Sequence, residues 1–139
     1  MNAPRMSTLD PVAEWHRILE DRDIAALASL LHDEAVFLSP VVHTPQRGKR
    51  IVMAYLGAAA VVLANPTFRY VREIVGPNDA MLEFETEIDG VSVNGIDLIR
   101  WDDAGRIIEF KVMVRPLKAI QAVHAKMAER LQSGSAALP

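Results

Sequence analysis

Asp97 is the charged residue on an otherwise apolar face of a predicted strand. The strand spans residues 91–101, and period-two alternation places these side chains on one face: Val91, Val93, Gly95, Asp97, Ile99 and Trp101. A carboxyl group among such neighbours loses its water, and burial without a cation favours the neutral acid, so we expect its pKa to be raised. A neutral carboxylic acid can donate a hydrogen bond to a carbonyl oxygen. Asp97 is therefore a candidate catalytic residue; the alternative is a structural acid satisfied by Trp15, a backbone amide or water.

A second candidate catalytic residue, His43, lies in a predicted loop. Pro40 and Pro45 make residues 40–47 irregular, between a short strand and a helix. Imidazole changes charge near neutral pH, so His43 is a candidate base at the mouth of a cavity. Ser39 is either a ligand-binding hydroxyl or a plain turn serine before Pro40, and as a nucleophile it would need His43 within reach.

The composition argues against several classes of partner. The net charge is −3, and the basic residues are scattered, which does not suit a nucleic acid backbone. Cysteine is absent, and the four histidines show no ligand spacing, so we expect neither a metal nor another cofactor. The longest apolar run, residues 58–64, is too short to span a membrane, and the N-terminus lacks the order of a secretory signal. A soluble, cytoplasmic protein is expected.

Helical spacing of apolar residues predicts four helices. Asp10 and Pro11 form a typical helix start, and Asp23 is a plausible cap for a second helix that would pair with the first as a hairpin. A third helix is predicted over residues 49–64, with an inner stripe of Ile51, Ala54, Tyr55, Ala58 and Val62. A closing helix follows residue 116 and carries Leu117, Ile120, Val123, His124 and Met127.

From residue 67 the hydrophobic period changes to two, which indicates strands. A short strand at 35–39 is followed later by strands at 67–75, 80–88, 91–101 and 106–114, the last four joined by turns as an antiparallel meander. Phe84 lies on the inward face of its strand. The inward positions of the last strand are Ile108, Phe110, Val112 and Val114. The outer face mixes charged residues with Ile96 and Leu98, which is too apolar for open water, so we expect a homodimer through this face.

These elements predict a single α+β domain. Its architecture is a cone-shaped, curved antiparallel sheet wrapped around N-terminal helices, as in cystatin-like folds, with a C-terminal helix and an internal pocket. We expect the domain to span residues 10–131, after a flexible N-terminus at 1–9 and before a disordered tail at 132–139.

The element order and several segments carry a family resemblance. Residues 23–27, 39–40 and 95–107, together with Gly48, resemble the nuclear transport factor two-like superfamily, in its SnoaL-like and ketosteroid-isomerase-like branch. The resemblance covers residues 12–116. It implies the cone-shaped fold, whereas its members include isomerases, cyclases, dehydratases and binding domains without activity.

The resemblance also implies roles for individual positions. Asp97 falls where the isomerases place a neutral acid in their oxyanion hole, a carboxyl group that its apolar surroundings keep protonated. Trp15 occupies the place of their oxyanion-hole tyrosine, and its indole N–H can donate a hydrogen bond but does not exchange a proton; helix–sheet packing is the alternative. Ser39 stands where they carry the aspartate base. Four further positions lie where isomerase pockets contact their steroid: Tyr55, Phe110, Val112 and Val114.

The resulting functional prediction has two branches. The first is a SnoaL-like domain that binds a small, mostly apolar metabolite and acts as a cofactor-independent isomerase, cyclase or dehydratase, with Asp97 as acid or hydrogen-bond donor. Ordinary ketosteroid isomerisation is not expected, because the hydroxyl of Ser39 without an adjacent base does not abstract a proton from carbon. The second is a non-catalytic ligand-binding or dimeric interaction module.

Overall fold

The computed structural model describes residues 10–134. The first helix, α1 (Pro11–Asp21), begins where the sequence predicts, and the Asp10 carboxylate accepts a hydrogen bond from the backbone N–H of Ala13 at 3.1 Å. The longer helices are α3 (Lys49–Val62) and α4 (Leu117–Gly134). None of the helices within residues 10–134 is long and apolar enough to cross a membrane.

The strands form one six-stranded sheet in the order β2-β1-β6-β5-β4-β3. Their bounds are β1 (Leu31–Leu38), β2 (Gln46–Arg47), β3 (Arg69–Val75), β4 (Asp79–Ile88), β5 (Val91–Trp101) and β6 (Ile107–Arg115). The last four strands pair antiparallel in chain order, which confirms the predicted meander. β1 joins the sheet parallel to β6.

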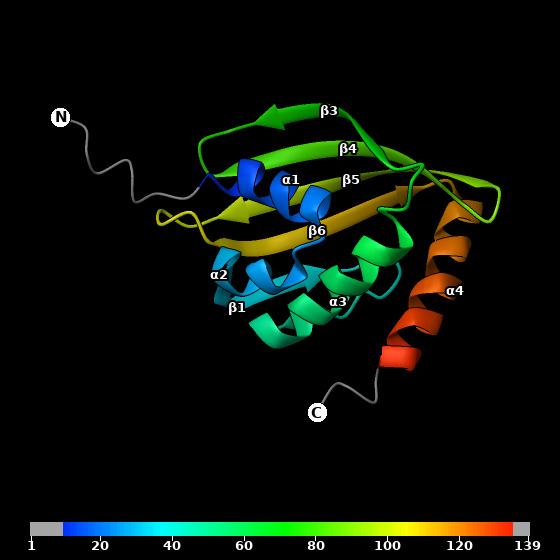
Figure 1. Cartoon of the computed structure of the whole chain (residues 1–139), viewed down its shortest axis with the longest axis horizontal. Helices are drawn as coiled ribbons and strands as arrows, with labels where there is room; N and C mark the ends of the chain where they lie inside the picture. The colour runs from blue at the N-terminus through cyan, green and yellow to red at the C-terminus, as the bar shows by residue number, and fades with distance from the viewer. Residues whose placement is uncertain (1–9, 135–139) are drawn as a thin grey trace.

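Figure 1 shows the sheet as a curved layer, with α1, α3 and α4 against one side of it. The core lies between these layers, because inward residues of the strands, such as Leu82 and Phe110, pack with Ile18 of α1 and Leu56 of α3. Antiparallel sheets with one covered face show alternating burial, and β5 follows this pattern from Val93 to Trp101. The α+β class and the cone-shaped architecture predicted from the sequence are confirmed.

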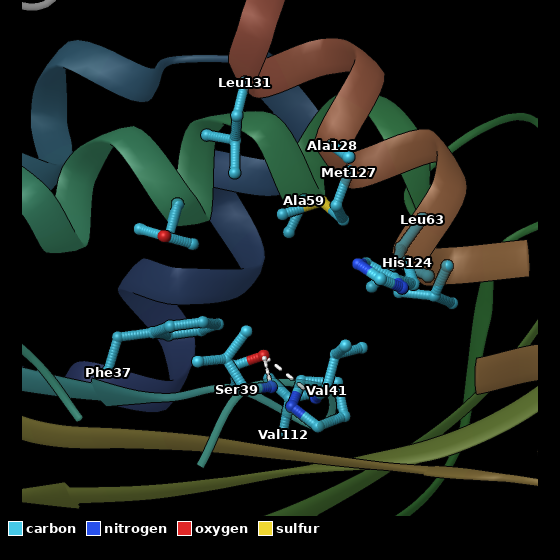
Figure 2. A pocket seen from close by; sticks show the side chains of 14 residues that line it. Phe37, Ser39, Val41, Ala59, Leu63, Val112, His124, Met127, Ala128 and Leu131 are labelled. Carbon is cyan, nitrogen blue, oxygen red and sulfur yellow. Dashed lines mark hydrogen bonds between the residues drawn. The ribbon is translucent and has the colours of Figure 1, made fainter. Parts of the chain in front are cut away.

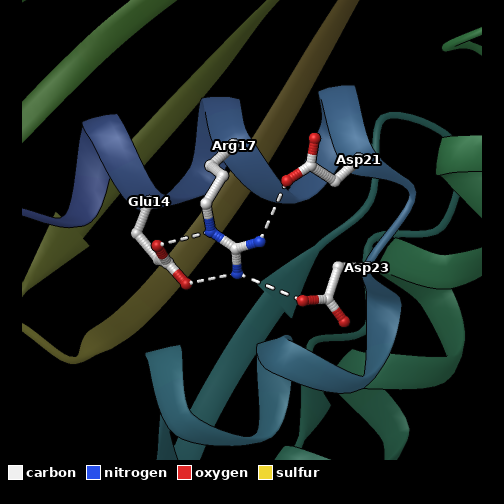
Figure 3. Close-up of polar contacts among 4 residues, drawn as sticks. All are labelled: Glu14, Arg17, Asp21 and Asp23. Carbon is white, nitrogen blue, oxygen red and sulfur yellow. Dashed lines mark hydrogen bonds and ion pairs between the residues drawn. The ribbon is translucent and has the colours of Figure 1, made fainter.

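The region after α1 differs from the predicted helical hairpin. A short 3₁₀ turn (Ile24–Ala26) leads into α2 (Leu27–Leu30), which has a single turn, and Leu31 already begins β1. Asp23 does not cap this segment with its side chain. Its carboxylate instead accepts a hydrogen bond from Arg17, whose guanidinium also contacts Glu14 and Asp21 (Figure 3). This partly exposed ion pair network ties the end of α1 to the following turn.

The predicted inner stripe of α3 is only partly right. Ala58 is buried as predicted, but the other buried positions are Val52, Leu56 and Ala60, whereas Ile51 is exposed. After Lys49 and Arg50 the helix carries no charged residue, so periodicity does not single out one face. In α4 the prediction is also partly wrong: Val123 is buried as predicted, but Leu117 and His124 are exposed, and Ala119, outside the predicted stripe, is buried.

Two boundaries depart from expectation as well. A bulge between Arg100 and Trp101 pairs Trp101 with Ile107, so Ile107 is fully buried and Ile108 is only half-buried. The helix α4 continues to Gly134, although the tail was predicted to be disordered from residue 132. The expected flexible segment 1–9 and residues 135–139 lie outside the described residues.

Candidate functional site

Asp97 lies at the end of a chain of side-chain hydrogen bonds. The Trp15 indole Nε1–H donates to the Tyr70 hydroxyl at 2.8 Å, and the Tyr70 hydroxyl donates to Asp97 Oδ2 at 2.5 Å. The three residues come from α1, β3 and β5, so the chain connects a helix to two strands. Asp97 is 6% exposed, and Tyr70 is its hydrogen-bond partner among residues 10–134.

A β-bulge in the edge strand β3 turns Tyr70 inward. From the turn after β3, the pairs run Ile74–Met81, Glu73–Leu82 and Arg72–Glu83, and the register then shifts so that Tyr70 lies opposite Phe84. Without the bulge, Val71 would face Phe84 and Tyr70 would lie on the outer face. The Tyr70 ring is held edge-on by Phe68 and His16, at centroid distances of 4.9 Å and 5.1 Å.

Burial controls the electrostatics of this group. Desolvation raises the pKa of Asp97 from 3.8 to about 7, against the hydrogen bond from Tyr70, which lowers it. Desolvation, with the neighbouring Asp97 charge as a second cause, raises the pKa of Tyr70 well above its ordinary value. Tyr70 therefore stays a protonated donor, whereas Asp97 changes its protonation near neutral pH.

Asp97 faces a small internal cavity of about 30 Å³. Trp15, Tyr70, Phe84, Phe110 and Asp97 all contribute to its walls. A volume of this size holds a water molecule or a single ligand atom, but not a whole metabolite. Within the described residues, the lining holds no carboxyl or imidazole group other than Asp97 itself.

A larger cavity of about 200 Å³ lies next to it. Its walls are mostly apolar, and three of its lining side chains carry polar atoms, namely Ser39, Tyr55 and His124. Figure 2 shows Ser39 and His124 entering this space from different walls, with α4 contributing His124, Met127, Ala128 and Leu131. Ala59, Leu63 and Val112 line both cavities, so the two spaces adjoin at these side chains.

The predicted site residues divide between these two spaces. Trp15, Phe84, Asp97 and Phe110 line the smaller cavity, and Ser39 and Tyr55 line the larger one. Val112 lines both. The structure therefore brings most of these side chains into one region beneath the helices.

Two predicted residues lie elsewhere. His43 is exposed in the loop before β2, and Val114 is half-buried on β6; neither lines either cavity. In this loop only Val41 and Val42 reach the larger cavity, whereas His43 and Thr44 are exposed on the surface.

Sequence reasoning missed two polar residues of the site. Tyr70 was not recognised because the bulge reverses the face that simple counting assigns to it. His124 was assigned to the stripe of the closing helix, and its spacing from Val123 and Met127 is the signal that places it beside them at the cavity. No cluster of metal-ligating side chains occurs within residues 10–134.

Comparison with known proteins identifies the family to which this chain belongs. The model of the SnoaL-like domain matches residues 12–110, and the chain belongs to this family. The structure of a steroid delta-isomerase from Pseudomonas aeruginosa is 39% identical in sequence, with a TM-score of 0.86 over 91% of this chain and 92% of that one.

Two further solved structures share the fold. A protein from Silicibacter pomeroyi with a cystatin-like fold is 26% identical, with a TM-score of 0.83, covering 93% of this chain and 90% of that chain. A nuclear transport factor two-like protein from Mesorhizobium loti is 25% identical, with a TM-score of 0.67 over 77% and 89% of the two chains. A search of curated proteins finds no match.

Proposed function

We propose that the chain binds a small, mostly apolar metabolite in the larger cavity and that Asp97 acts on an oxygen of this ligand. The observation that carries the proposal is a buried carboxyl group with one hydrogen-bond partner, which faces an internal cavity and has a pKa of about 7. Lone buried acids are costly to a fold unless they are paired or useful.

The hydrogen-bond chain persists when Asp97 is neutral. When Asp97 carries a proton on Oδ1, Oδ2 still accepts from Tyr70, which itself accepts from Trp15. All donors then point the same way, and each bond polarises the next. The proton on Oδ1 is free to bind an oxygen atom placed in the smaller cavity, whose volume of about 30 Å³ fits one such atom.

The reaction class that fits this geometry is a cofactor-independent isomerisation or elimination next to a carbonyl group. Asp97 would stabilise the negative charge that develops on the carbonyl oxygen while a base removes a proton from carbon. His124 lines the ligand cavity, whereas the predicted base His43 does not, so His124 is the better-placed base. The name of the Pseudomonas aeruginosa relative, a steroid delta-isomerase, supports the isomerase class.

Ligand binding without turnover is the second candidate function. It is favoured by the smaller cavity, whose lining within residues 10–134 offers Asp97 no neighbouring base. Both candidates need the same pocket, and both fit a cytoplasmic protein without a cofactor, as the sequence predicts.

Native mass spectrometry of the purified wild-type protein and the Asp97→Asn variant tests the proposal. We expect the wild type to retain an apolar compound that the variant loses, because asparagine offers a weaker donor to the ligand oxygen. With the substrate identified from that mass, Asp97→Asn should lower kcat about 100-fold or more if the protein is an enzyme. A protein that holds no compound in either form, and that binds none when apolar ketones are added, would contradict the proposal.

A further inference from the structure

The half-buried hydroxyl of Ser39 has no acceptor for its proton among residues 10–134. Its Oγ accepts hydrogen bonds from the backbone N–H groups of Val41 and Val42, at 3.0 Å and 3.2 Å. A serine oxygen has two lone pairs, so both acceptor positions are filled and the hydroxyl proton remains to be donated. Within residues 10–134 no group accepts this proton, and Ser39 lines the larger cavity (Figure 2).

The two backbone donors also fix this hydroxyl in place. They hold Oγ from the side of the loop, so its proton is directed away from residues 41–42. They also draw electron density from the oxygen, which strengthens the hydrogen bond that the hydroxyl can give. A fixed donor on the wall of an apolar cavity is the usual means by which such a site orients a ligand.

The size of the cavity limits the ligand. A volume of about 200 Å³ exceeds the roughly 150 Å³ of an engineered cavity in another protein that binds benzene. It is smaller than the roughly 300 Å³ at which pockets for drug-sized ligands begin. The cavity therefore suits one substituted ring or a short branched chain.

We propose that the larger cavity binds a compact apolar compound of about one ring, whose acceptor oxygen takes a hydrogen bond from Ser39. This inference rests on the proposed function only in taking this cavity as the ligand site. Ser39 then anchors the outer end of the ligand, and Ala59, Leu63 and Val112, which line both cavities, lie where the inner end of the ligand meets the smaller cavity beside Asp97. The inference assigns to Ser39 the role of an orienting donor, without proton abstraction.

Two probes of matched shape test the anchor. Acetophenone and isopropylbenzene have the same number of non-hydrogen atoms, but only acetophenone carries an oxygen acceptor. Their dissociation constants would be measured by NMR titration of the full-length wild type and of the variants Ser39→Ala, Tyr55→Phe and Asp97→Asn. Tyr55→Phe is the matched control, because Tyr55 carries another hydroxyl group of this cavity.

We expect the wild type to bind acetophenone about fivefold to tenfold more tightly than isopropylbenzene, which is the contribution of one hydrogen bond. Ser39→Ala should abolish this preference without changing the affinity for isopropylbenzene, whereas the control Tyr55→Phe should retain it. 2-Acetylnaphthalene, with a second ring, should bind at least about tenfold more weakly than acetophenone.

Other outcomes overturn the inference, and they separate it from the proposed function. A preference that survives Ser39→Ala but is lost in Asp97→Asn removes the anchor and supports Asp97 as the group that binds the oxygen. A preference lost only in Tyr55→Phe moves the anchor to Tyr55. Equal binding of both probes by the wild type excludes an anchor in this cavity, and no binding of either probe contradicts both proposals. Tighter binding of the naphthalene compound overturns the size limit.

Discussion

Asp97, Tyr70 and Trp15 form a directed hydrogen-bond chain in which each donor has a fixed acceptor. The indole N–H cannot accept a hydrogen bond, and the raised pKa of Tyr70 keeps its proton in place, so the direction of the chain does not reverse. The proton that changes near neutral pH belongs to Asp97. The hydrogen-bond chain is therefore sensitive to pH at Asp97.

The raised pKa of Asp97 predicts how stability depends on pH. A folded-state pKa of about 7, against 3.8 for an ordinary aspartate, means that the folded state binds more protons than the unfolded state between these values. The free energy of unfolding then falls as pH rises from 4 to 7, by up to about 4 kcal/mol from this residue.

Urea unfolding of the wild type and Asp97→Asn at several pH values measures this effect. Asparagine can still accept a hydrogen bond from Tyr70 but never ionises. The free energy of unfolding of the variant should therefore rise relative to that of the wild type as the pH rises. Subtracting the two curves removes the contributions of other carboxylates. A difference that is constant between pH 4 and pH 8 would show that Asp97 ionises as an ordinary exposed residue does.

Tyr70→Phe tests the hydrogen bond itself. The Tyr70 hydroxyl favours the ionised form of Asp97, because it lowers the pKa of that carboxyl. Removing it should cost about 1–3 kcal/mol at pH 8, where Asp97 is charged, and less at pH 5, where it is neutral. The same urea series measures both losses. An equal loss at the two pH values would indicate that the hydroxyl contributes only packing.

At the scale of elements, strand β5 carries Asp97 and, on the same face, Gly95, where Phe84 and the Met113 backbone leave no space for a larger residue. A Cβ atom at Gly95 would lie 2.5 Å from the Phe84 ring and 2.6 Å from the Met113 carbonyl oxygen. Phe84 in turn lies across from Tyr70 and stacks on Phe68 at a centroid distance of 5.3 Å. The glycine thus allows the aromatic wall of the smaller cavity to pack against the strand.

We expect Gly95→Ala to destabilise the protein by about 1–3 kcal/mol, as overpacked cores do. Gly57→Ala is the matched control: in helix α3 the added Cβ would meet Ile24 at an ordinary 3.5 Å, so alanine should stabilise by about 0.5–1 kcal/mol. Thermal unfolding of both variants measures the two signs. A neutral Gly95→Ala would show that Phe84 is free to move.

The elements differ in how far the sequence could predict them. The bounds of β5 and the burial of Asp97 were predictable, because strict alternation over the strand leaves one consistent assignment. The buried face of α3 was not, since an almost uniformly apolar helix has no periodic signal. Tyr70 depended on a bulge in an edge strand, and the size of the larger cavity depends on how α4 packs over the sheet, which no local pattern encodes.

At the scale of the whole molecule, the outer face of the sheet carries an apolar stripe between charged pairs. Ile74 pairs with Met81, Met81 with Leu98, and Ile96 with Met113, and two of these residues, Ile74 and Met113, are 59% and 50% exposed. Arg72–Glu83 and Arg100–Glu109 ion pairs, at 3.0 Å and 2.8 Å, lie on the same face. We propose this outer stripe as the surface of the homodimer expected from the sequence.

Sedimentation velocity at micromolar concentration tests the dimer. The wild type should sediment as a dimer, and Met113→Glu should shift it to monomer, because a buried charge without a partner opposes association. Leu117→Glu is the control, since Leu117 is 68% exposed on α4, outside the outer stripe, and its variant should remain dimeric. A monomeric wild type would leave the outer stripe without the proposed role.

The measurement that tests the central claim most directly is the titration of the Asp97 carboxyl group, followed by the carbon-13 NMR signal of its Cγ in the intact protein. The account predicts a midpoint near pH 7, where burial places it, so that a large fraction of the protein carries the neutral acid at neutral pH. A midpoint near pH 4 would show an ordinary ionised aspartate, and the proposed role of Asp97 as a hydrogen-bond donor to a ligand would be contradicted.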